Sequence, residues 1–211
     1  MKIVSVIKES FLEHEDYISL VLFCYACNMH CSYCYNYDFI MNPKNIIRGS
    51  IESIISSNIT PLTDSLVLLG GEPSMYPKSL DIARFSKERY NLSVKIFSNG
   101  SNPPLLIDGA KQGLFDSVSV DFKCYTKNDD ITYNGNWNDY ISGINLIFDA
   151  FEKYNMIDKL EIRTTVIPSI EKDVPKIKEI CASKGVKFIH QDDVKRSYEE
   201  INAIPRGNNS D

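Results

Sequence analysis

CNMHCSYC, residues 27–34, places three cysteines, Cys27, Cys31 and Cys34, within one short stretch of the chain. Cysteine thiolates are the usual ligands of iron–sulfur clusters. Three of them leave one iron of a four-iron cluster without a protein ligand, and an open position is typical of a catalytic metal site, whereas closed sites are structural. The stretch therefore predicts one reactive [4Fe–4S] cluster, in a loop that we place at residues 24–37.

The six cysteines allow two other interpretations. A disulfide framework is disfavoured, because the chain begins MKIVSVIKES without a charged-then-apolar leader, and six cysteines in 211 residues are few for a disulfide-dense scaffold. Zinc is the stronger rival, since Cys24 completes a second CxxC pair, but zinc modules separate their pairs by about 12–20 residues. We expect Cys24 to be a small buried side chain at a strand end, and Cys124 and Cys181 to be structural.

Composition sets broader limits. With 43% apolar and 11% aromatic residues, the chain is expected to form one soluble α/β domain at residues 1–195, followed by a polar tail at 196–211. No apolar stretch reaches the roughly 20 residues that cross a bilayer. The 23 basic and 28 acidic residues are scattered, so the net charge of −5 includes no basic block. We therefore expect a cytoplasmic protein that binds neither nucleic acid nor membrane.

Apolar runs typical of strands alternate with helical patterns along the chain. The strands are expected at 18–23, 65–69, 94–98, 117–122, 160–166 and 186–190, with a short extra strand at 4–8 outside the set. Helices are expected near the cysteine loop and at 51–57, 77–90, 104–112, 138–154 and 174–184, the last ended by Gly185. This alternation predicts parallel βαβ units with right-handed crossovers, and six of them would make an incomplete (β/α)6 barrel.

Polar residues follow nearly every expected strand. Ligands of parallel α/β folds lie at the carboxyl ends of the strands, so we expect one shared cavity there. Its rim would collect the cysteine loop, 70–73, 98–100, 121–123, Arg163 and 191–193.

The segment LLGGEPSMYP follows the second of these strands. Its two glycines let the backbone approach a ligand closely, and Glu72 offers a carboxylate to an ammonium group. CxxxCxxC together with GGEP resembles the radical S-adenosylmethionine (SAM) superfamily, whose fold is a partial TIM barrel. That resemblance implies that Gly70, Gly71 and Glu72 contact the methionine ammonium of SAM.

Later segments are similar to the branch of glycyl-radical-enzyme activating proteins. FSNGSNPPLLIDGAKQGLFDSVSVDFKCY and LEIRTTVIPSI resemble its third to fifth strands, and FLEHEDYISLVLFCYACNMHCSYCYN resembles the start of the activator of anaerobic ribonucleoside-triphosphate reductase. The resemblance implies SAM contacts from a set of polar residues, with Tyr33 near the adenine. The set is Ser98, Asn99, Asp121, Lys123 and Arg163.

Two departures from the related patterns matter. Phe97 stands where related activators often carry an acid, which puts in doubt a cation site found in some relatives. Tyr35 follows Cys34 where 7-carboxy-7-deazaguanine synthases place a small polar residue for magnesium. No cysteine lies between Cys34 and the second strand, which excludes an insert with extra clusters.

The resemblance implies an enzyme of anaerobic metabolism that reductively cleaves SAM and generates a glycyl radical on a partner, here an anaerobic ribonucleotide reductase. Flavodoxin or ferredoxin would donate the electron. Two alternatives stay open. One is a radical SAM enzyme that acts on a small molecule, similar to 7-carboxy-7-deazaguanine synthase, and the other is a non-catalytic redox or metal-binding module.

Overall fold

The computed structural model describes residues 1–44 and 46–193, so the expected tail at 196–211 lies outside the described residues. The strands are β1 (Ile3–Ser10), β2 (Ser19–Cys24), β3 (Met29–Cys31), β4 (Ser65–Gly70), β5 (Ser93–Ser98), β6 (Ser117–Asp121), β7 (Ile131–Tyr133), β8 (Leu160–Val166) and β9 (Lys187–Asp192). The helices are α1 (Tyr37–Met41), α2 (Ile51–Asn58), α3 (Lys78–Tyr90), α4 (Pro103–Lys111), α5 (Trp137–Lys153) and α6 (Val174–Lys184), with 3-10 turns at Pro73–Met75, Ile157–Lys159 and Glu171–Asp173.

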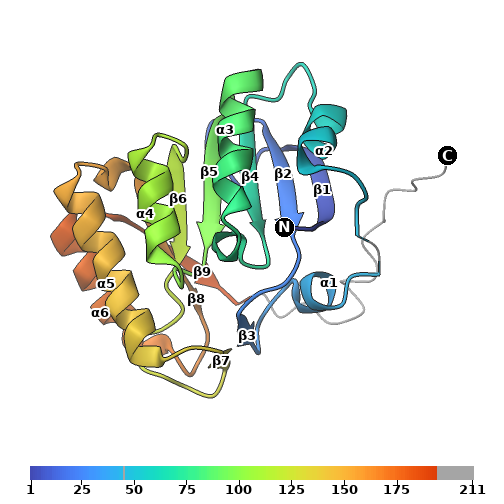
Figure 1. The fold of residues 1–211 in the computed structure, drawn as a ribbon. Coiled ribbons are helices and arrows are strands. Elements are labelled where there is room, and N and C mark those ends of the chain that lie inside the picture. Colours follow the sequence, from blue (N-terminus) through green and yellow to red (C-terminus); the bar gives the residue numbers. More distant parts are fainter. Residues whose placement is uncertain (45, 194–211) are drawn as a thin grey trace.

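The main sheet has the order β1-β2-β4-β5-β6-β8-β9. Its strands from β2 to β9 are parallel, and β1 alone runs antiparallel, against β2. Helices α3, α4 and α5 lie along one face of this sheet in Figure 1, and the carboxyl ends of the parallel strands point toward β3, β7 and α1. The expected incomplete (β/α)6 barrel is confirmed, including the extra N-terminal strand.

Helix ends follow the local chemistry of the sequence. The hydroxyl of Ser50 accepts the backbone N–H of Ser53 at the start of α2, and the side chain of Asn136 does the same for the first turn of α5. Gly185 ends α6 in the left-handed conformation at φ +67°, as expected. The expected helices and parallel strands agree with the observed ones within two residues at each end.

The two faces of the main strands differ in character. The helix-facing side chains, such as Leu66, Val94 and Ile162, are buried in one apolar core with the helices. The opposite face is polar at the amino ends of the strands, where Lys95 of β5 and Glu161 of β8 form a buried ion pair at 2.8 Å. No helix in the described part of the chain has the length and apolarity to cross a membrane.

The loop between β1 and β2 covers this polar end of the barrel. His14 is buried, and its Nδ1 lies 2.6 Å from the hydroxyl of Ser65. Glu15 reaches across to Lys187 of β9, with 2.6 Å between the carboxylate and the ammonium. The candidate site therefore has only one end of the barrel available, the carboxyl end.

A second, two-stranded sheet was not expected from the sequence. It pairs β3, which carries Cys31, with β7 in antiparallel register, Cys31 opposite Ile131. Ser32 extends the contact, because its N–H and its hydroxyl both donate to Asp130, at 2.8 and 2.6 Å. The cysteine loop is thus fastened to the segment that follows β6.

Candidate functional site

The cysteine loop leaves β2 at Cys24 and lies at the carboxyl end of the barrel. Cys27, Cys31 and Cys34 are partly exposed free thiols, whereas Cys24, Cys124 and Cys181 are buried. The expected burial of Cys24 at a strand end is thus observed, and Cys24 is only 1% exposed. The loop therefore leaves the thiols of Cys27, Cys31 and Cys34 accessible, whereas that of Cys24 is buried.

The environment of the three thiols opposes ionisation in the metal-free protein. Burial raises the pKa of Cys27 to about 12, with a further contribution from the carboxylate of Glu72, while the N–H of Met29 acts in the opposite direction. Burial also raises the pKa values of Cys31 and Cys34, and the nearby Lys123 partly offsets it. Because metal ligands bind as thiolates, loading this site must release protons.

The two glycines after β4 are required by close backbone contact. Gly70 has φ +108°, which favours glycine. A Cβ on Gly71 would lie 1.8 Å from the carbonyl oxygen of Ala26, which is too close for any side chain to fit at this position. The N–H groups of Gly71 and Glu72 donate to the carbonyls of Cys24 and Ala26, at 3.0 and 2.9 Å. The glycine turn therefore supports the cysteine loop directly.

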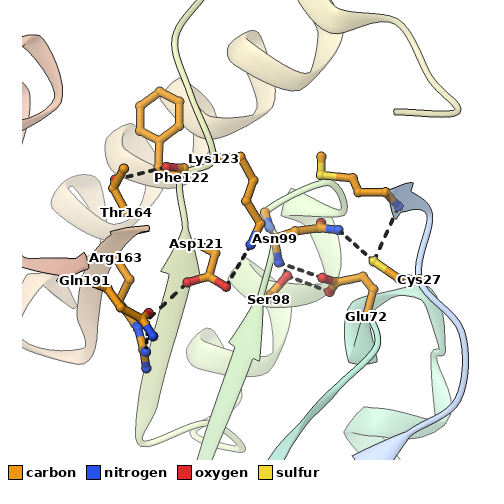
Figure 2. Close-up of polar contacts among 12 residues, drawn as sticks. Cys27, Glu72, Ser98, Asn99, Asp121, Phe122, Lys123, Arg163, Thr164 and Gln191 are labelled. Atoms are coloured by element: carbon orange, nitrogen blue, oxygen red, sulfur yellow. Dashed lines mark hydrogen bonds and ion pairs between the residues drawn. The ribbon is translucent and has the colours of Figure 1, made fainter. Parts of the chain in front are cut away.

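Glu72 is 1% exposed and lies at the centre of a hydrogen-bond network (Figure 2). Its carboxylate accepts the N–H of Ser74 at 3.0 Å, the hydroxyl of Ser98 at 2.7 Å and the N–H of Asn99 at 2.6 Å. Burial raises its pKa, and these donors partly offset the rise. Glu72 thus joins the turns after β4 and β5, and its expected contact with an ammonium stays a prediction.

Asn99 connects this network to the cysteine loop. Its Nδ2 donates to Oδ1 of Asn28 at 2.9 Å and lies 3.7 Å from Sγ of Cys27. Asn28 in turn donates to the hydroxyl of Ser101 at 2.8 Å. A continuous polar path therefore runs from Glu72 to the first cysteine (Figure 2).

A charged group lies beside this path, at the ends of β6 and β8. Asp121 pairs with Lys123 at 3.1 Å and with Nε of Arg163 at 3.8 Å, and Arg163 also donates to the side chain of Gln191 at 2.8 Å (Figure 2). Burial lowers the pKa of Lys123, but Asp121, Tyr33 and Cys31 more than offset this, so the net pKa lies well above the usual value. Lys123 is therefore a permanent cation.

Tyr33 and Arg163 carry polar atoms that the described residues do not satisfy. The hydroxyl of Tyr33 and Nε of Arg163 are buried without a well-formed hydrogen bond in the described part of the chain. The ring of Tyr33 lies over Lys123, with 5.9 Å from the ammonium to the ring centroid. A buried polar atom without a partner costs about 1–3 kcal/mol, so these two atoms suit a bound polar ligand.

The structure brings most of the expected residues to one place, at the carboxyl ends of β2, β4, β5, β6 and β8. The exception is the carboxyl end of β9, where Gln191 contacts Arg163 but Asp192 contacts His190 at 3.0 Å. Sequence reasoning missed Asn28, which links Asn99 to Ser101, and Asp173, which accepts both N–H groups of Tyr125 and Thr126. Neither residue stands in a pattern that marks it.

The matching family description is "Radical SAM superfamily", and it covers residues 21–180. The chain belongs to the radical SAM superfamily. The family that the cysteine spacing and the GGEP turn resemble is thus the family of this radical SAM protein. A relative from Methanocaldococcus jannaschii, named as a glycyl-radical enzyme activating enzyme, is 31% identical over 90% of this chain and 80% of its own length. That likeness supports the activating-enzyme branch.

A solved structure supports the fold of this radical SAM protein. The structure titled "Native anSMEcpe with bound AdoMet" aligns with a TM-score of 0.61 and 18% identity, over 84% of this chain. This chain spans about half, 52%, of that longer chain. QueE from Escherichia coli aligns with a TM-score of 0.48 and 12% identity, over 90% of this chain and 93% of its own.

The residues present fit the cofactors that the radical SAM family implies. Three free thiols on one loop form a soft sulfur donor set, which suits an iron–sulfur cluster. Among residues 1–44 and 46–193, no three His, Cys, Asp or Glu side chains form a group that could hold a single metal ion. Beside the thiols, the cations of Lys123 and Arg163, the carboxylate of Asp121 and two unsatisfied polar atoms suit the charges and polar groups of SAM.

Proposed function

We propose that this radical SAM enzyme generates a glycyl radical on a partner enzyme, and that the partner is an anaerobic ribonucleotide reductase. The observation that carries the proposal is the 31% identity to the M. jannaschii relative over 80% of its length. The proposal includes cytoplasmic location, an anaerobic setting and a single catalytic domain at residues 1–195. The named partner rests on the resemblance of the N-terminal segment to ribonucleotide reductase activators.

In this proposal, Cys27, Cys31 and Cys34 hold the [4Fe–4S] cluster. Asp121, Lys123 and Arg163 orient SAM, with Tyr33 beside it, and the Glu72 network fixes the turns on which Gly70, Gly71, Ser98 and Asn99 lie. The cluster and SAM together supply reductive cleavage of the sulfonium, which ends with transfer of a hydrogen atom from a glycine Cα to the 5′-deoxyadenosyl group. The protein's task is to position SAM and exclude water.

The open barrel supports a polypeptide substrate. Within the described residues β9 pairs only with β8, and β1 only with β2, so the sheet does not close on itself. A glycine in a protein must reach the site as part of a loop, and an unclosed barrel leaves a side through which a loop could enter.

The test begins with anaerobic reconstitution and incubation with SAM and dithionite. We expect 5′-deoxyadenosine to form, and the Cys31→Ala variant to form none. Adding the ribonucleotide reductase should then produce the doublet signal of a glycyl radical in electron paramagnetic resonance. SAM cleavage without a radical on any glycyl radical enzyme would favour the small-molecule alternative. No SAM cleavage by a fully loaded cluster would favour the non-catalytic module.

A further inference from the structure

A shallow depression of about 480 Å³ is lined by residues that lie close to the cysteine loop. It is formed by the start of the chain and by residues between α1 and α2, which are joined by the hydrogen bond from the N–H of Ile47 to the carbonyl of Ile3. Its lining residues are Lys2, Pro43, Lys44, Ile46, Ile47 and Arg48. We call this surface the basic depression.

The charge of the basic depression contrasts with that of the chain. Lys2, Lys44 and Arg48 are exposed, and within residues 1–44 and 46–193 no acidic residue lines the depression and none of these three cations forms an ion pair. The whole chain carries a net charge of −5. Unpaired cations gathered on one surface of an acidic protein create a local positive potential, which attracts and orients an acidic partner.

Backbone contacts place the basic depression close to the first cysteine. The carbonyl of Lys2 accepts the N–H of Tyr25 at 2.9 Å, and the carbonyl of Ile3 accepts the N–H of Ile47 at 2.9 Å. Tyr25 precedes Cys27 by two residues, so their Cα atoms are at most about 7 Å apart. A protein bound here would therefore lie next to the cysteine loop.

We propose that the basic depression docks the reduced, acidic one-electron carrier protein that supplies the electron for SAM cleavage, an inference that rests on the proposed function. The carrier loses one electron and is oxidised by one step. The iron–sulfur cluster accepts that electron, and no proton or other group is transferred. Two isoleucines and three cations line the depression, a composition that suits a small, transient interface of the kind that electron-transfer proteins form, below about 1,200 Å².

The decisive variant replaces all three cations: Lys2→Gln, Lys44→Gln and Arg48→Gln. A matched control makes the same charge change with Arg89→Gln, Lys111→Gln and Lys153→Gln, which are exposed residues near the carboxyl ends of α3, α4 and α5, at the far end of the barrel. Reduced flavodoxin and reduced ferredoxin serve as separate probes. The rate of cluster reduction is followed by stopped-flow absorbance, and binding to the reconstituted protein by titration calorimetry.

At about 0.01 M salt we expect the variant to lose tenfold or more in the second-order rate constant and in carrier affinity, while the control stays within about twofold of the wild type. Near 1 M salt, where the Debye length is about 3 Å, the difference should largely disappear. Reduction and SAM cleavage by dithionite should be unchanged. The probe that shows the larger loss identifies the class of carrier.

Equal carrier rates in the variant and the control would overturn the docking proposal. Failure of the wild type to cleave SAM with dithionite would instead overturn the proposed function, so the two failures are distinguishable. If the triple variant loads less iron, the single Lys44→Gln variant and the salt dependence of the wild type give the same test. A wild-type rate that is independent of salt would also contradict the proposal.

Discussion

The N–H of Asn99 donates to the buried carboxylate of Glu72 at 2.6 Å, so an acid that follows β4 fixes the turn that follows β5. Glutamine at position 72 keeps the shape but turns an NH₂ group toward donors that need an acceptor. We expect Glu72→Gln to lower the free energy of unfolding by about 1–3 kcal/mol, the cost of a buried unsatisfied donor. Urea denaturation measures it, with the exposed Glu171→Gln as the control. Equal stability of both variants would show that the carboxylate does not hold the turn.

Gly71→Ala should displace the cysteine loop, because the new Cβ would lie 1.8 Å from the carbonyl oxygen of Ala26. We expect a loss of about 1–3 kcal/mol of stability, typical of overpacking, and a lower iron and sulfide content after reconstitution. Gly113→Ala is the matched control, since its Cβ meets nothing within 4 Å and only φ +67° opposes it. Full cluster loading in Gly71→Ala would contradict the supporting role of this turn.

Lys123→Met should weaken SAM binding. Lys123 is the cation nearest to Asp121, at 3.1 Å, and hydrogen bonds to charged groups contribute about 1.5–3 kcal/mol. We therefore expect a Kd for SAM that is tenfold to a hundredfold higher, measured by titration calorimetry on the reconstituted protein. Lys153→Met, at the far end of α5, is the control. An unchanged Kd would mean that Lys123 serves only to neutralise Asp121.

His14 makes stability depend on pH. Burial, and then the charge of Lys95, lower its pKa from 6.5 to about 4, while Asp116, Glu161 and Asp64 act in the opposite direction. Between these two pKa values the unfolded chain binds a proton that the folded chain does not. This contribution to stability is therefore complete above about pH 6.5 and declines as the pH falls toward 4.

The expected result is a flatter pH dependence in His14→Gln, which keeps a polar group for the hydroxyl of Ser65. Chemical denaturation of the metal-free protein between pH 7 and pH 4 measures the slope, because acid lability of the cluster then plays no part. His30→Gln is the control, as His30 is only partly buried and contacts Tyr37 at 3.3 Å. An identical slope in His14→Gln and the wild type would assign the acid sensitivity to other groups.

The barrel could be predicted because its strands are short segments with apolar runs or apolar alternation, such as SLVLLG in β4 and SVSVD in β6, which differ from the helical patterns around them. The position of the site followed from the same alternation, since parallel strands bring their carboxyl ends together. The β3–β7 sheet could not be predicted in this way. Its strands have three residues each, and they pair across about a hundred residues of chain, where no local period is visible.

The expected roles of the site residues had a similar limit. The GGEP motif predicted that Glu72 belongs to the site. It could not show that three hydrogen-bond donors from two turns converge on the carboxylate of Glu72. The departure at Phe97 was visible in the sequence, whereas its surroundings were not. The structure places two cations near its ring, with Lys95 and Arg163 each 4.9 Å from the ring centroid.

The pairing of β3 with β7 has a consequence for the order of events during synthesis. Proteins emerge from the ribosome amino end first, so the three cysteines emerge about a hundred residues before the strand that fastens their loop. Until residues 131–133 are translated, Cys31 has no partner strand and Ser32 no Asp130. Insertion of the proposed cluster into an ordered loop would therefore be a late step, and a chain truncated before β7 would leave the three thiols without the strand that holds their loop.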